Sequence, residues 1–88
     1  MRESTEERAL AALERFRASL PPQDFEGVRD LIVHREWGLG LEVLCEQLYE
    51  HGIAVDHASL RAIRELAEEM QMPAQTWKFL ETPQNRFG

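Results

Sequence analysis

Hydrophobic residues recur every three or four positions along most of this chain, which is the spacing of one face of an α-helix. The first such segment begins at Ser4 or Thr5, where Ser4 followed by Glu7 forms a capping-box pattern, and it ends at Pro21. The pattern therefore predicts a first helix whose apolar face carries Leu10, Leu13, Phe16 and Leu20.

Two further helices are expected to follow directly. The second begins near Pro22, ends near His34 or Arg35, and has Phe25, Val28, Leu31 and Ile32 on its buried side. The third runs from Trp37 or Leu39 to His51, and its buried stripe contains Leu41, Leu44, Cys45 and Leu48. Because glycine adopts conformations that other residues avoid, Gly38 and Gly40 are expected to let the chain turn tightly into this helix.

Turn and capping residues mark the last part of the fold. Gly52 is expected to end the third helix in the left-handed conformation, and Asp56 to cap a fourth helix. That helix buries Leu60, Ile63, Leu66, Ala67 and Met70, and Pro73 marks its end or the beginning of a short fifth helix around residues 76–80. Strand signals are weak. The sequence predicts one all-α domain over residues 1–88, a small antiparallel bundle of four helices plus a short C-terminal helix or turn.

Composition narrows the class of protein. A chain of 88 residues with 43% hydrophobic and 30% charged residues fits one small folded domain. Its net charge of −6 opposes direct binding to nucleic acid and favours a cationic protein partner. The lone Cys45 allows no intrachain disulfide, and no apolar run approaches the roughly 18 residues that a membrane span needs. We therefore expect a cytoplasmic protein with no membrane partner.

Residues that could carry catalysis are sparse. His34, His51 and His57 contain no pair spaced by four, the spacing that puts two imidazoles on one helix face for a metal. Cys45 lies on the same predicted face as Leu41 and Leu48, where a thiol behaves as a small buried hydrophobic group. We therefore expect no enzymatic activity, no cofactor and no metal site.

The strongest functional signal is an acidic stretch that contains no base. Between Glu36 and Leu60 there are five acids and neither lysine nor arginine. On a helix, Glu42, Glu46 and Glu50 form one stripe with carboxylates about 6 Å apart, a spacing that resembles successive phosphates of a nucleic-acid strand. The stripe is either a solvated face or a surface for a basic partner. In the second case the candidate interface residues are Glu36, Glu42, Glu46, Tyr49, Glu50 and Asp56.

Aromatic residues leave two alternatives open. Trp37 and Trp77 either close the ends of a small bundle or anchor an interface, because tryptophan and tyrosine are frequent at binding hot spots. Tyr49 lies at the border between the apolar and acidic faces of the third helix, where its ring can pack inward while its hydroxyl meets a partner.

Part of the chain resembles a known family. The residues concerned are Glu36-Trp37-Gly38-Leu39 and Leu44-Cys45-Glu46-Gln47-Leu48-Tyr49-Glu50, followed by a linker, a helix at 60–70 and Trp77. Over residues 30–80 this pattern is similar to bacterial immunity proteins of the MafI type. The resemblance implies a small cytoplasmic antidote that binds the C-terminal domain of a toxin, often a nuclease. It supplies no established interface residues, so the assignment of the acidic residues to an interface rests on charge.

Two functional hypotheses follow. The first is an immunity protein that docks the acidic face of its third helix on a basic toxin domain, expected to be a nuclease. The second is a non-enzymatic helical adaptor or scaffold that binds a protein partner, or a second copy of itself, through an apolar patch that includes Trp77, Phe79 and Phe87.

Overall fold

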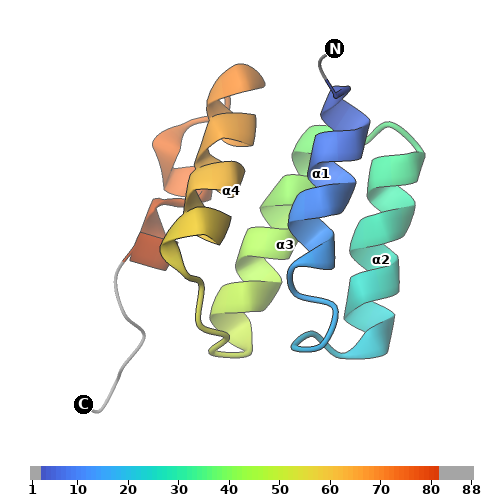
Figure 1. The fold of residues 1–88 in the computed structure, drawn as a ribbon, viewed down its shortest axis with the longest axis vertical. Helices are drawn as coiled ribbons and strands as arrows, with labels where there is room; N and C mark the ends of the chain where they lie inside the picture. Colours follow the sequence, from blue (N-terminus) through green and yellow to red (C-terminus); the bar gives the residue numbers. More distant parts are fainter. Residues whose placement is uncertain (1–2, 82–88) are drawn as a thin grey trace.

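The computed structural model describes residues 3–81, which form four α-helices and two short 3-10 helices (Figure 1). The α-helices are α1 (Thr5–Glu14), α2 (Pro22–Val33), α3 (Trp37–Glu50) and α4 (His57–Glu69), and the 3-10 helices are η1 (Ala74–Thr76) and η2 (Lys78–Glu81). Successive helices alternate in direction along the molecule (Figure 1). Residues 3–81 contain no strand. The predicted all-α bundle of four antiparallel helices with a short C-terminal helical segment is confirmed.

Side chains cap the helices at the two starts where capping was expected. The Glu7 N–H donates to Ser4 Oγ (3.1 Å) and the Ser4 N–H donates to Glu7 Oε1 (2.9 Å), which completes the capping box of α1. At α4, the Ser59 N–H donates to Asp56 Oδ1 (2.8 Å). This backbone hydrogen bond is the main reason that the pKa of Asp56 lies below its ordinary value.

Three helices end with one residue in the left-handed conformation. Gly52 (φ 63°) ends α3 as expected, and Arg35 (φ 68°) and Gln71 (φ 58°) do the same for α2 and α4. In each case the next N–H donates five residues back, for example from Ile53 to the Leu48 carbonyl (3.0 Å). Glycine is the residue that usually marks a left-handed helix end in a sequence, and positions 35 and 71 are arginine and glutamine. This mode of termination was therefore predicted only for α3.

The first helix ends earlier than its pattern indicates. It was expected to run to Pro21, but α1 ends at Glu14 and the chain continues in tighter turns, with N–H bonds from Phe16 to Leu13 (2.9 Å) and from Ser19 to Phe16 (3.0 Å). These turns redirect the chain while still burying Phe16 and Leu20 in the core. Residues 15–20 contain neither proline nor glycine, so no local helix breaker accounts for the end of α1 at Glu14.

The core lies between the inner faces of the four helices. Leu13, Val28, Ile32, Leu44 and Leu48 are among its fully buried members. The predicted stripe of α3 is confirmed in full. A few predicted core residues lie only partly buried at its margin, namely Leu10, Leu31, Leu60 and Met70. No helix between residues 3 and 81 is long and apolar enough to span a membrane.

Gly40 has a different role from the one expected. Gly38 and Gly40 both lie inside α3, and the tight turn before it is made by Arg35 instead. Gly40 is buried against α2, where an added Cβ would lie 2.9 Å from Ile32 Cγ1. The missing side chain therefore allows α2 and α3 to approach closely, a tertiary requirement that the local sequence did not reveal.

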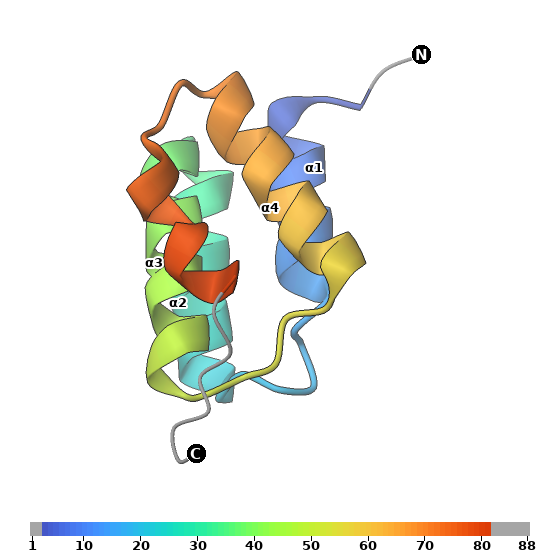
Figure 2. The same ribbon diagram turned by 90° about the vertical axis from the view of Figure 1, so that its left-hand side faces the viewer.

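The C-terminal turns fold back over the bundle (Figure 2). The first turn, η1, contacts α4 and η2 contacts α3, so this segment links the two helices. Trp77 and Leu80 are buried and anchor the segment. Its position places residues 72–79 beside the exposed face of α3.

We expect Gly40→Ala to destabilise the protein by about 0.5–2 kcal/mol, because overpacking against the stiff, buried Ile32 exceeds the gain in helix propensity. The matched control is Gly27→Ala on α2, where the added Cβ would point into open space. That variant should gain about 0.5–1 kcal/mol. Chemical denaturation measures both changes. Equal stabilisation by the two alanines would contradict the close contact at Gly40.

The cap of α4 should give a pH-dependent stability. A carboxyl group with a lowered folded pKa stabilises the fold above its unfolded value, ordinarily 3.8 for Asp56, and loses this contribution as the pH falls through the folded pKa. The wild type should therefore be more stable than Asp56→Ala near neutral pH, and the difference should shrink in acid. Asp56→Asn can still cap the helix but does not titrate. A wild-type advantage over Asp56→Ala that stays constant down to about pH 2 would contradict the ionic cap.

Candidate protein-binding groove on helix α3

The exposed side of α3 carries most of the predicted interface residues. Glu42, Glu46, Tyr49 and Glu50 are exposed, while Leu44 and Cys45 on the other side of the helix are buried. This separation follows from the helical repeat, since residues four apart lie on one face. The structure therefore places these four predicted residues on one continuous strip.

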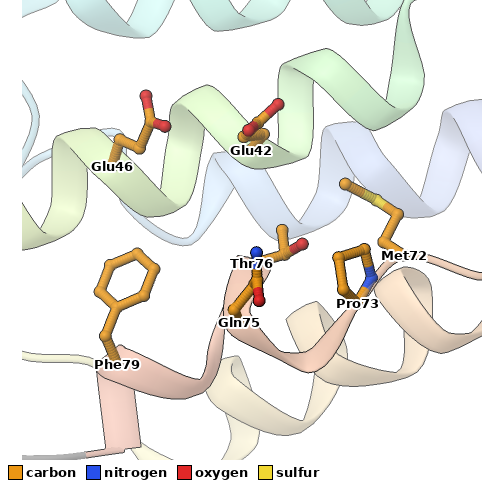
Figure 3. A pocket seen from close by; sticks show the side chains of 7 residues that line it. All are labelled: Glu42, Glu46, Met72, Pro73, Gln75, Thr76 and Phe79. Carbon is orange, nitrogen blue, oxygen red and sulfur yellow. The ribbon is translucent and has the colours of Figure 1, made fainter.

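A groove runs between this strip and the segment that follows α4 (Figure 3). Its volume is about 240 Å³, and its lining combines carboxylates with apolar and amide side chains: Glu42, Glu46, Met72, Pro73, Gln75, Thr76 and Phe79. In Figure 3, Glu42 and Glu46 project from α3 along one rim, and Met72, Thr76 and Phe79 reach toward the helix from the opposite wall. The groove is thus acidic on one side and largely apolar on the other.

Tyr49 holds the aromatic wall of the groove in place. Its ring meets Phe79 edge to face, with centroids 5.2 Å apart and an interplanar angle of 84°. Tyr49 nevertheless remains 53% exposed. Tyr49 therefore packs against the C-terminal segment and still offers surface to a partner.

The carboxylates of the acidic rim form no ion pair within the described part of the chain. Other carboxylates pair with bases there, as Glu14 does with Arg17, Glu69 with Arg8, and Asp24 with His51 (2.9 Å). Between residues 3 and 81, Glu42, Glu46 and Glu50 take part in no ion pair and no side-chain hydrogen bond. Neighbouring like charges on a helix repel each other modestly. An incoming cation would relieve that repulsion.

Glu36, Glu50 and Asp56 do not line the groove. Glu36 precedes the first residue of α3, so it lies about 20 Å along the axis from Glu50 at the other end. The Asp56 carboxylate caps α4. Of the six predicted interface residues, the structure brings together Glu42, Glu46 and Tyr49 around Phe79. Glu50 continues the strip one turn farther.

Sequence reasoning missed the second wall of the groove. The sequence indicated Phe79 only as part of an apolar patch and Pro73 only as a helix boundary, and it gave no functional signal for Met72, Gln75 or Thr76. No local pattern marks them, because their approach to α3 depends on how η1 and η2 fold back. Trp77 is only 7% exposed and so does not contribute to an apolar surface patch, and Phe87 lies outside the described residues.

The other groups considered for chemistry are the thiol of Cys45 and the possible metal ligands. Cys45 is 0% exposed, and burial, together with the nearby charges of Glu46 and Glu42, raises the pKa of its thiol to about 12. The burial expected for Cys45 is confirmed. No group of three histidine, cysteine or acidic residues within residues 3–81 is placed to hold a metal ion.

Comparison of the chain with protein-family models, with curated proteins and with solved structures gives no significant match. The resemblance to immunity proteins of the MafI type therefore stays a prediction. The groove and its charges are the observations from which a function can be argued.

We expect the Cys45 thiol to react slowly in the folded protein, because both its burial and its raised pKa suppress the reactive thiolate. Iodoacetamide labelling at neutral pH, followed by mass spectrometry, should be slow in native buffer and fast in denaturant. The denatured sample serves as the control for reagent activity. Labelling at equal rates in the two conditions would contradict a buried thiol.

Proposed function

We propose that this chain is an immunity protein that binds and neutralises a basic bacterial toxin domain through the acidic face of α3. The observation that carries the proposal is the groove in which Glu42 and Glu46 lie exposed beside Phe79 and form no ion pair with any residue between 3 and 81. The proposal agrees with the predicted resemblance of residues 30–80 to immunity proteins of the MafI type.

The charge of the chain suits rapid capture of a cationic partner. A net charge of −6 on 88 residues attracts a basic surface at long range, and the base-free face of α3 concentrates this attraction. Electrostatic attraction chiefly raises the association rate, whereas slow dissociation requires buried contacts. Tyr49 and the apolar wall of the groove can supply such contacts.

The proposed mechanism is stoichiometric blockage. If the toxin is a nuclease, its substrate channel is basic, and carboxylates about 6 Å apart along α3 can occupy positions that phosphates would otherwise take. The inhibitor then excludes the substrate without performing chemistry. Protection of the cell calls for a Kd near 1 nM or lower, about −12 kcal/mol.

Growth rescue tests the proposed function directly. Cells express the C-terminal domain of whichever toxin-like gene lies immediately upstream, with and without this chain. The wild type should restore growth, and a Glu42→Lys, Glu46→Lys, Glu50→Lys triple variant should not, because it turns attraction into repulsion. Circular dichroism of the purified variant checks that it is folded.

The matched control is Glu68→Lys, which changes an exposed carboxylate on α4 and should still rescue. Binding of the purified toxin domain should also weaken strongly from low to physiological salt. Salt-insensitive binding, unaffected by the triple variant, would favour the adaptor function with an apolar interface. Absence of rescue by the wild type, with both proteins soluble, would overturn the immunity function for that toxin.

A further inference from the structure

The groove on α3 has the dimensions of a site for one side chain. Its volume of about 240 Å³ is below the roughly 300–1,000 Å³ of clefts that hold drug-sized ligands. It is also short, because its length along α3 covers only the turn between Glu42 and Glu46. A partner would therefore insert a single residue here and place the rest of its interface outside the groove.

The two walls of the groove would contact different parts of the inserted side chain, because one wall is acidic and the other is apolar. Glu42 and Glu46 offer carboxylates one helical turn apart, and neither forms an ion pair within the described residues. Across from them, Met72, Pro73 and Phe79 offer apolar surface and one aromatic ring. An occupant that satisfies both walls has a long aliphatic stem and a cationic, planar end.

We propose that this groove binds one arginine side chain of the partner. The methylene stem packs on Met72 and Pro73, and the guanidinium lies between the carboxylates of Glu42 and Glu46 and the ring of Phe79. Arginine fits this arrangement better than lysine because its planar fork hydrogen-bonds carboxylates at two points and stacks on aromatic faces. The Tyr49 contact holds the Phe79 ring before the partner arrives.

Only the assignment of this arginine to a toxin rests on the proposed function. Binding of the side chain itself is a property of the groove and can be measured on the free protein. The two ideas can therefore fail separately.

The probe is N-acetyl-arginine methylamide, titrated into the full-length ¹⁵N-labelled chain at low salt and followed by NMR. We expect saturable shifts that concentrate at residues 42–49 and 72–79, with a Kd on the order of 1–10 mM. N-acetyl-citrulline methylamide has nearly the same shape but no charge and should give no saturable shift. The corresponding lysine compound should bind more weakly than the arginine compound.

Three variants locate the binding residue by residue. Glu46→Gln and Phe79→Leu should each raise the Kd about two- to fivefold, the first through lost charge and the second through the lost ring. Glu50→Gln removes the same charge from the same strip but lies outside the groove, so it should raise the Kd less than Glu46→Gln does. The amide spectrum of each variant confirms its fold.

Shifts spread evenly over all acidic segments, equal Kd values for Glu46→Gln and Glu50→Gln, or equal binding of arginine and citrulline compounds would overturn the groove assignment. An affinity for lysine equal to that for arginine would overturn the stacking on Phe79. Arginine binding in the groove without growth rescue would overturn the immunity function for that toxin and leave the groove assignment standing. Rescue that survives Glu46→Gln combined with Phe79→Leu would overturn the use of the groove in inhibition.

Discussion

The arrangement of this small domain depends on the burial of one face of α3. This helix contacts α1, α2, α4 and η2, and its residues Leu41, Leu44, Cys45 and Leu48 are at most 2% exposed. With that face fixed in the core, the orientation of the opposite face is fixed as well. A chain of this size buries only roughly 60–65% of its unfolded surface on folding, so its stability depends strongly on this central contact. The acidic strip is thus kept on the surface by the same packing that stabilises the fold.

The carboxylates of the bundle fall into two groups, those that hydrogen-bond to the backbone at helix starts and those that face solvent. Some support the fold directly: the Glu7 carboxylate accepts from the Ser4 N–H at the start of α1, and the Asp56 carboxylate accepts from the Ser59 N–H at the start of α4. Glu42 and Glu46 have no such contacts between residues 3 and 81, and their mutual repulsion slightly opposes helix formation. Substitutions there should therefore change binding more than stability, which makes the proposed interface separable from the fold by mutation.

Much of the fold was predictable because its signals are local. The three- and four-residue spacing located all four helices, and Gly52 and Asp56 marked two of their boundaries correctly. The errors arose where tertiary packing decides. No breaker precedes the end of α1 at Glu14, and nothing near Gly40 shows that α2 approaches it. For the same reason the sequence indicated the acidic wall of the groove, whereas the wall formed by residues 72–79 became visible only in the folded chain.

The two walls of the groove are anchored to the core by different residues. The α3 wall is part of the central core, whereas the Phe79 wall follows the last α-helix and is held mainly through Trp77, Leu80 and the Tyr49 ring. Any ligand that touches both walls has higher affinity for the docked arrangement than for one in which the C-terminal segment has detached. By thermodynamic linkage, such a ligand also strengthens the docking itself. Occupancy of the groove should consequently slow amide hydrogen exchange in residues 74–81, far more than in α1 or α2.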